Sequence, residues 1–195
     1  MCVNERMRGA KFMTRENIST AFKFNDVDSR IVSELIANEK TPKQFEILDR
    51  EAYRMTDSCY WFCLSTLWVA SSEIAGLEDW KRLFSVKRPN KAISLMKPDE
   101  LKALAKLPNK IEVFRAHREG ETDWIAYSTN PRIAINFANR YGVSEITVGR
   151  VKKHDVTALF LRRGEQEVIV PDKSLVKKVT TIQLVEVQTN ETQSK

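Results

Sequence analysis

The sequence predicts an α+β fold, in which a helical N-terminal region packs on a β-rich C-terminal half. Three observations lead to this fold class. Apolar residues recur at helical spacing across residues 41–106, and the period changes to that of strands after Pro108. One helix with clear start and stop signals then interrupts the strands at residues 130–142.

The helices are predicted from apolar spacing and from their end signals. Thr41 and Pro42 form a start signal, because proline is favoured at the first helical position. Asp57 or Ser58 is the expected cap of the next helix, which carries a stripe of aromatic side chains that we assign to the core. Gly76 ends that helix. The expected helical segments are residues 28–38, 42–55, 58–75, 77–84 and 98–107.

The C-terminal half reads as short strands around one helix. Asn130 is a good N-cap, Pro131 takes the first helical position, and Gly142 follows the helix end. The expected strands are residues 111–117, 123–129, 144–152, 156–162, 165–171 and 179–187. We therefore divide the chain into a helical region at residues 1–108, a compact core at residues 109–188 and a disordered tail at residues 189–195.

Composition predicts an ordinary soluble protein of the cytoplasm. Of the 195 residues, 42% are hydrophobic and 30% are charged. The longest apolar cluster, Tyr60 to Ala70, is far shorter than the roughly 20 residues that span a bilayer, so we expect no membrane partner. The first residues lack the apolar run of a secretory signal. An odd and small number of cysteines, three, favours reduced thiols in the cytosol.

No metal site is expected. Cys59 and Cys63 are four residues apart and therefore share a helical face. No histidine or further cysteine lies near them to complete a tetrahedral site, and buried thiols are the better interpretation. The two histidines, His117 and His154, are too few for a metal cluster.

The charge of the chain is uneven. The net charge is +6; residues 1–100 carry 16 Lys and Arg against 15 Asp and Glu, whereas residues 101–195 carry 16 against 11. A basic half suits an anionic ligand such as a nucleotide, a phosphate or a nucleic acid. A merely soluble surface explains an excess of this size equally well, so a nucleic-acid partner stays open.

Two glutamates stand at the head of an apolar run in "GEQEVIVP". Side chains alternate along a strand, so Glu165 and Glu167 are expected side by side on one face. Like charges in that arrangement repel each other. That face either points to water or points into a site that requires carboxylates.

Two further residues precede them in the chain. Arg115 is expected on one face of its strand with Val113 and His117, where an arginine either reaches water or binds an anion through two hydrogen bonds. Ser128, in "YSTNP", ends a strand at a place where a hydroxyl can hold another group. Serine, threonine and asparagine are also common where a helix begins, so neither residue is specific alone.

Taken together and in this order, the three elements resemble the Arg–Ser–Glu class of ADP-ribosyltransferases. The resemblance covers residues 111–184; "EQEVIVP" is its most specific part, and "YSTNPRIAINFA" is the next. The size and layout resemble those of small bacteriophage and bacterial members. The resemblance implies a core of two facing sheets with flanking helices. It also implies a mono-ADP-ribosyltransferase, a type of glycosyltransferase, with NAD⁺ as co-substrate and with release of nicotinamide.

The resemblance also implies roles for single residues. Glu167 matches the catalytic glutamate, and Glu165 matches the residue that engages the acceptor in arginine-directed members. The implied acceptor is therefore a protein arginine, in the host cytoplasm if the chain is phage-encoded. Ser128 matches the serine that supports the ribose and orients the catalytic glutamate. Arg115 matches the arginine that contacts the dinucleotide.

Lesser matches complete the expected NAD⁺ site. Thr129 is expected behind the site, and Tyr127 at the wall of the nicotinamide pocket. Ala116 stands where relatives often have glycine, which an alanine can replace if its φ is negative. Asn130 replaces the last residue of the family's Ser-Thr-Ser segment and keeps its capping role. His117 is expected to be structural.

Two alternatives remain open at this point. One is a catalytically degenerate ADP-ribosyltransferase fold that acts as a protein- or nucleic-acid-binding module. The other is an enzyme of the same fold that uses another acceptor or simply hydrolyses NAD⁺, since acceptor choice depends on loops.

Overall fold

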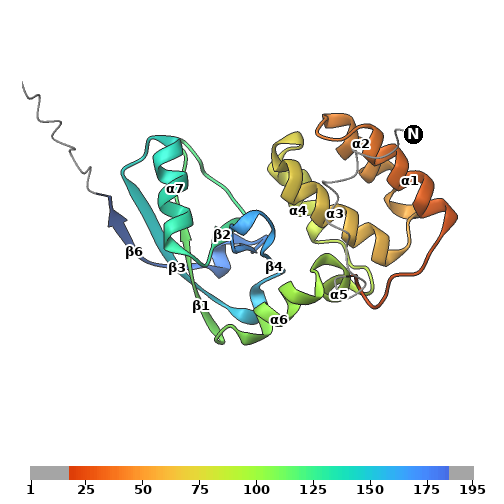
Figure 1. Ribbon diagram of the computed structural model, residues 1–195. Helices are drawn as coiled ribbons and strands as arrows, with labels where there is room; N and C mark the ends of the chain where they lie inside the picture. Colours follow the sequence, from red (N-terminus) through yellow and green to blue (C-terminus); the bar gives the residue numbers. More distant parts are fainter. Residues whose placement is uncertain (1–17, 185–195) are drawn as a thin grey trace, which may run out of the picture.

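The computed structural model describes residues 18–184, and its helices and strands separate into two parts along the chain (Figure 1). The expected tail at residues 189–195 lies outside the described residues. The first part is helical. Its helices are α1 (Asp26–Ala37), α2 (Pro42–Glu51), α3 (Asp57–Ser71), α4 (Leu77–Phe84), α5 (Lys91–Leu95) and α6 (Pro98–Lys106), with short 3₁₀ turns η2 (Ala52–Arg54) and η3 (Ser72–Ile74).

Local hydrogen bonds explain where these helices begin. Asn25 caps α1 by accepting hydrogen bonds from the backbone N–H groups of Val27 and Asp28. Thr56 caps α3 by accepting from the N–H of Cys59, so the predicted cap at Asp57 or Ser58 is one or two residues too late. The whole length of α3 is apolar on nearly all sides, which is typical of a helix at the centre of a core.

The second part is a sheet with one long helix. The strands are β1 (Lys110–Arg115), β2 (Ala126–Ser128), β3 (Glu145–Lys152), β4 (Ala158–Phe160), β5 (Glu167–Ile169) and β6 (Lys177–Gln183). Helix α7 (Pro131–Tyr141) follows β2, and η4 (Lys153–Asp155), η5 (Arg162–Gly164) and η6 (Lys173–Leu175) are short turns. Asn130 caps α7 and left-handed Gly142 ends it, as the sequence predicts.

The described strands form one continuous antiparallel sheet, with the order β4-β5-β2-β1-β3-β6. The expectation of two facing sheets is therefore wrong for these residues. The physical reason lies in β2, whose backbone pairs with β1 on one side and with β5 on the other. The strand expected at residues 123–129 is also shorter than predicted, because only Ala126–Ser128 makes ladder hydrogen bonds.

The helical part and α7 pack against different faces of the sheet (Figure 1). Ile111 and Val113 of β1 belong to a large buried cluster that includes the side chains of α3 and α4. Phe114, the next residue, points to the opposite face and packs with Ala134 and Ala138 of α7. Alternation along β1 thus joins both layers, and the helical part shares a continuous core with the sheet.

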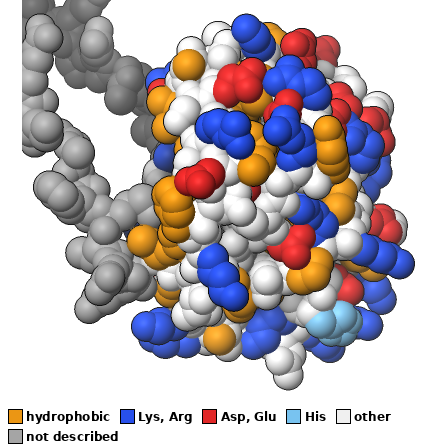
Figure 2. Space-filling model, turned by 90° about the vertical axis from the view of Figure 1, so that its right-hand side faces the viewer, with side chains coloured by type: hydrophobic (Ala, Val, Ile, Leu, Met, Phe, Trp, Pro, Cys, Tyr) orange, Lys and Arg blue, Asp and Glu red, His pale blue; other side chains and the backbone are white. Residues whose placement is uncertain are grey.

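The outer face of the helical part carries charges of both signs. Figure 2 shows Lys and Arg side chains interspersed with Asp and Glu across this face. Several large apolar side chains of the helical part are also exposed, among them Phe24, Ile36 and Tyr53. Isolated exposed apolar residues are ordinary on protein surfaces. On this face of the helical part, the Lys and Arg side chains do not gather into a basic patch.

Candidate functional site

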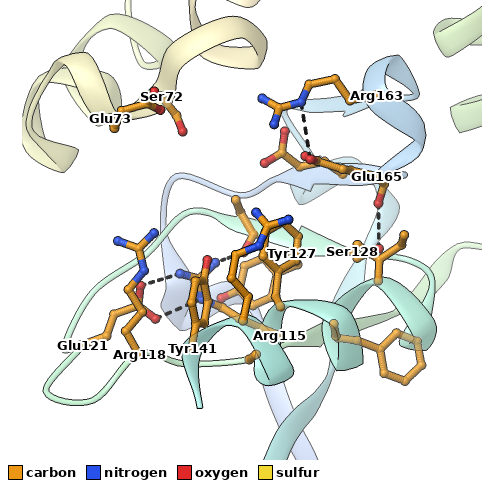
Figure 3. A pocket seen from close by; sticks show the side chains of 18 of the residues that line it. Ser72, Glu73, Arg115, Arg118, Glu121, Tyr127, Ser128, Tyr141, Arg163 and Glu165 are labelled. Carbon is orange, nitrogen blue, oxygen red and sulfur yellow. Dashed lines mark hydrogen bonds and ion pairs between the residues drawn. The ribbon is translucent and has the colours of Figure 1, made fainter. Parts of the chain in front are cut away.

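A cavity of about 330 Å³ lies where the helical part meets the sheet and α7. Its walls come from α3, η3, β1, β2, α7 and the segment from η5 to β5 (Figure 3). This volume falls at the lower end of the range of small-molecule sites, roughly 300–1,000 Å³. The cavity therefore gathers side chains from both parts of the chain into one site.

Six of the seven residues predicted from the sequence line this cavity, namely Arg115, Ala116, Tyr127, Ser128, Glu165 and Glu167. The seventh, Thr129, is not part of the lining. Its backbone N–H donates to the backbone oxygen of Gln166 at 3.0 Å. Thr129 therefore supports the backbone beside the cavity and does not line it.

Glu167 is the first residue of β5 and pairs with Ser128 across the sheet. Its carboxylate accepts a hydrogen bond from the indole N–H of Trp68, with 2.9 Å between Nε1 and Oε2. Burial is the main reason that the pKa of Glu167 is raised to about 7, and the nearby charge of Glu165 adds to this. The hydrogen bond from Trp68 and the charges of Arg115 and Arg163 act in the opposite direction.

The two glutamates do not alternate along one strand, so that prediction is wrong. Glu165 has helical backbone angles, φ −80° and ψ −15°, and the strand begins only at Glu167. Gln166 between them has φ +48°, and Arg163 and Gly164 also have positive φ. A tight turn rather than strand alternation therefore brings both carboxylates to the cavity. Residues other than glycine that are held at positive φ are uncommon, and they are enriched at functional sites.

Ser128 fixes this turn through its hydroxyl group. Its Oγ donates to the backbone oxygen of Glu165 at 2.8 Å and accepts from the N–H of Asn130 at 3.1 Å. Ser128 is buried. The hydroxyl thus reaches the backbone beside the two glutamates and not the carboxylate of Glu167, which refines the role expected from the resemblance.

Arg115 is held by an acidic residue that the sequence did not indicate. Its guanidinium bonds both carboxylate oxygens of Glu121, at 3.2 Å and 2.5 Å, and donates to the backbone oxygen of Ala126. His117 lies 3.2 Å from the same carboxylate. Burial raises the pKa of Glu121, but the hydrogen bonds from His117 and Arg115 outweigh it, and the pKa lies below its ordinary value.

Glu121 belongs to the polar segment "REGETD", where no periodic spacing marks it. The sequence therefore could not show that it would fold back onto Arg115. The structure also agrees with the expectation for Ala116: it is buried, and its φ is not positive. An alanine fits this position without the strain that a left-handed backbone would cause.

Tyr127 contributes an apolar wall. Its ring is buried, and its hydroxyl accepts a hydrogen bond of 2.7 Å from the indole of Trp124. Burial is the largest cause of its raised pKa, about 12, so the hydroxyl is neutral across the physiological range. Trp124 in turn packs on His117, with ring centroids 4.1 Å apart. Tyr127 therefore supplies shape rather than charge.

Other charged residues at the cavity were not singled out from the sequence. Arg118 and Arg140 line it from the loop after β1 and from α7, and Glu73 lines it from η3 (Figure 3 labels Arg118 and Glu73). Among residues 18–184, neither Arg118 nor Arg140 forms an ion pair; each lies over an aromatic ring, Tyr141 and Phe137 respectively. The cavity therefore offers cationic groups beyond Arg115.

No protein-family model matches the chain, and the searches of curated proteins and of solved structures also found no match. In the described part of the chain, no helix is long and apolar enough to cross a membrane. The same residues hold no group of three or more His, Cys, Asp or Glu side chains placed to bind a metal ion. The site must therefore be interpreted from its own geometry.

Proposed function

We propose that this protein is a mono-ADP-ribosyltransferase that transfers ADP-ribose from NAD⁺ to an acceptor and releases nicotinamide. One observation carries the proposal: Glu167, with its raised pKa, shares a single cavity with Arg115, Ser128 and Glu165. Residues far apart in the sequence, chosen for their resemblance to one class of enzyme, lie together around one cavity. The proposal includes action in the cytoplasm.

The chemistry requires a carboxylate beside a developing positive charge. As the bond between ribose C1′ and nicotinamide breaks, its electron pair leaves with nicotinamide and the ribose becomes oxocarbenium-like, as in glycoside hydrolysis. A fixed carboxylate in a site of low polarity stabilises that charge. An acceptor nitrogen then bonds to C1′ and loses a proton. Glu167, in its ionised form, is suited to stabilise the positive charge on the ribose.

Arginines around the cavity suit the anionic part of NAD⁺. Arg118 and Arg140 line the cavity, and in the described residues no carboxylate neutralises them. Guanidinium groups bind phosphate through paired hydrogen bonds. We assign Arg118 and Arg140 to the pyrophosphate, with Arg115 nearer the ribose because it donates to the backbone of β2.

Glu165 supports a guanidinium acceptor. Its carboxylate lies 3.5 Å from the Nε of Arg163, and both side chains line the cavity. A guanidinium of the chain itself thus lies beside Glu165. This observation supports a protein arginine as the acceptor, with Glu165 placed to receive the proton that the arginine loses.

One observation favours the alternative, a degenerate fold that binds a protein or nucleic acid without catalysis. The guanidinium of Arg115 is already bonded to both oxygens of Glu121, so NAD⁺ must share or displace that contact. Calorimetry separates the two functions. Absence of NAD⁺ binding together with absence of nicotinamide release would refute the enzyme and favour the binding module.

The decisive test uses NAD⁺ labelled on the nicotinamide and, separately, on the adenylate. The purified chain should release nicotinamide and transfer the adenylate label to protein arginine, located by mass spectrometry. Glu167→Gln removes one charge with little change of shape and should lower nicotinamide release by at least about 100-fold. The matched control is Glu112→Gln, on the exposed part of β1, which should leave the rate unchanged. Undiminished release by Glu167→Gln would refute the site.

A further inference from the structure

The helical part contacts the candidate catalytic turn through one face of α3. Ser65, Trp68 and Val69 are three and four residues apart and therefore lie on the same side of the helix. Each of them makes a hydrogen bond to the segment Arg162–Glu167. The two residues of each pair are 94 to 99 positions apart in the sequence, so only the tertiary fold brings them together.

Arg162 makes the most buried of these contacts. Its guanidinium donates to the hydroxyl of Ser65 at 3.1 Å and pairs with Glu100 of α6 at 3.0 Å. The side chain of Glu100 is only 1% exposed and also accepts from the backbone N–H of Leu161. A buried ion pair with several hydrogen bonds allows little movement, because breaking it leaves an uncompensated charge. The start of the turn is thereby fixed to two helices.

Arg163 and Trp68 fix the rest of the turn. Arg163 donates to the backbone oxygen of Val69 at 2.8 Å while its Nε faces Glu165. Trp68 is buried, and its only polar side-chain atom, Nε1, donates to the carboxylate of Glu167. Its ring is held in edge-to-face contacts with Trp80 and Phe84, at centroid distances of 5.3 Å and 5.5 Å. Its direction is thus set by the core of the helical part.

We propose that Trp68 is a positioning residue that orients the carboxylate of Glu167, so that the helical part completes the catalytic site instead of merely flanking it. The proposal deepens the function proposed above and rests on it where catalysis is concerned. The hydrogen bond from the indole holds Oε2 of Glu167 in place, while the other oxygen remains available at the cavity that Glu167 lines. It also favours the ionised carboxylate in an otherwise desolvated place.

The charged groups around Glu167 allow the contribution of Trp68 to be isolated. Glu165 raises the pKa of Glu167, whereas Arg115 and Arg163 lower it, and the substitution Trp68→Phe leaves all three in place. Phenylalanine keeps an aromatic ring in the core but removes the N–H donor. The expected result is a further upward displacement of the Glu167 titration, by about one pH unit or roughly tenfold in the ionisation constant.

The matched control is Trp61→Phe on the same helix. Trp61 is also buried, and its indole N–H donates to the backbone oxygen of Pro89 and not to Glu167. Both variants lose one indole and one hydrogen bond, so both should unfold at lower denaturant concentrations. Only Trp68→Phe should move the titration of Glu167, followed by NMR of carboxyl-labelled glutamate and assigned with Glu167→Gln.

Two readouts separate the failure of this proposal from failure of the proposed function. The first is a pH profile of nicotinamide release, whose midpoint should rise in Trp68→Phe but not in Trp61→Phe, while the KM for NAD⁺ changes little. The second needs no variant and no activity. The indole N–H resonance of Trp68 in the unaltered protein should shift with the same midpoint as Glu167.

Unequal outcomes are informative. Coupled titration of Trp68 and Glu167 without nicotinamide release supports the contact and refutes the enzyme. Nicotinamide release with an indole resonance that stays constant through the titration of Glu167 overturns the role of Trp68. If Trp68→Phe does not fold, the measurement on the unaltered protein still decides the question.

Discussion

The hydroxyl of Ser128 donates a hydrogen bond of 2.8 Å to the backbone oxygen of Glu165, 37 residues further along the chain. This bond joins the end of β2 to the turn that precedes β5. The two strands are also paired directly, with Ser128 opposite Glu167. Ser128 therefore determines where the turn carrying both glutamates lies, through the backbone and not through a carboxylate.

Substitution of this serine should cost stability as well as activity. Ser128→Ala leaves the partly buried backbone oxygen of Glu165 without its donor, and we expect a loss of about 1 to 2 kcal/mol in the free energy of unfolding. Denaturation in urea measures this. Thr129→Ala is the control, because the hydroxyl of Thr129 is exposed and lies 3.4 Å from Gln166, so its loss should cost less than about 0.5 kcal/mol. Equal losses in the two variants would contradict this role of Ser128.

Glu165 and Glu167 should separate the two halves of the proposed reaction. Glu165 faces Arg163 at the edge of the cavity, and its side chain is 28% exposed. Glu165→Gln should still release nicotinamide from NAD⁺, with water as acceptor, but should lose at least about tenfold in transfer to arginine. Release and transfer are measured in the same reaction by the two labels. A parallel loss of both activities would place Glu165 in the cleavage step instead.

The rate of nicotinamide release should rise with pH through about pH 7. The pKa of Glu167 is raised to about 7, chiefly by burial, and only its ionised form stabilises the oxocarbenium-like ribose. The pH profile of kcat/KM reports this ionisation in the free enzyme. An activity that stays constant between pH 5 and pH 8 would exclude Glu167 as the group whose charge is needed.

Stability should change in the opposite direction with pH. Glu167 has a higher pKa in the folded protein than in the unfolded chain, so between about pH 4.5 and pH 7 the folded state binds more protons. The free energy of unfolding therefore loses up to about 3 kcal/mol from this group as pH rises through that window. Glu167→Gln should remove this loss. Urea titrations of both proteins at pH 5 and pH 8 test it, and an identical pH dependence would contradict the assignment.

Arg118 should affect NAD⁺ binding more than catalysis. Its guanidinium lies over the ring of Tyr141 at 4.8 Å and lines the cavity. Removal of a phosphate ligand in Arg118→Ala should raise the KM for NAD⁺ about tenfold with little change in kcat. The control is Arg150→Ala on β3, which removes an exposed arginine and changes the net charge of the protein by the same amount. An unchanged KM in Arg118→Ala would exclude Arg118 from the pyrophosphate site.

Local signals were sufficient to predict most helices and the location of the strands. Pro42, Pro98 and Pro131 each begin a helix, as expected from the preference of proline for the first turn. The strands were located correctly but predicted too long at β2, β4 and β5, because a strand ends where its partner ends and not where apolar residues end. The single sheet was not predicted, since pairing on both edges of β2 depends on distant strands.

The sequence by itself determined which residues are candidates for the site. Arg115, Ser128, Glu165 and Glu167 could be selected because their types and order resemble those of one class of enzyme. Only the tertiary structure decided how they are held. Glu121 contacts Arg115 across a loop, where no periodic spacing marks it. Trp68 belongs to the apolar stripe of its helix, so the sequence assigned it to the core but could not show its hydrogen bond to Glu167, 99 residues away. Periodic patterns report which face of an element is buried, whereas hydrogen bonds to a buried charge depend on what the fold brings next to it.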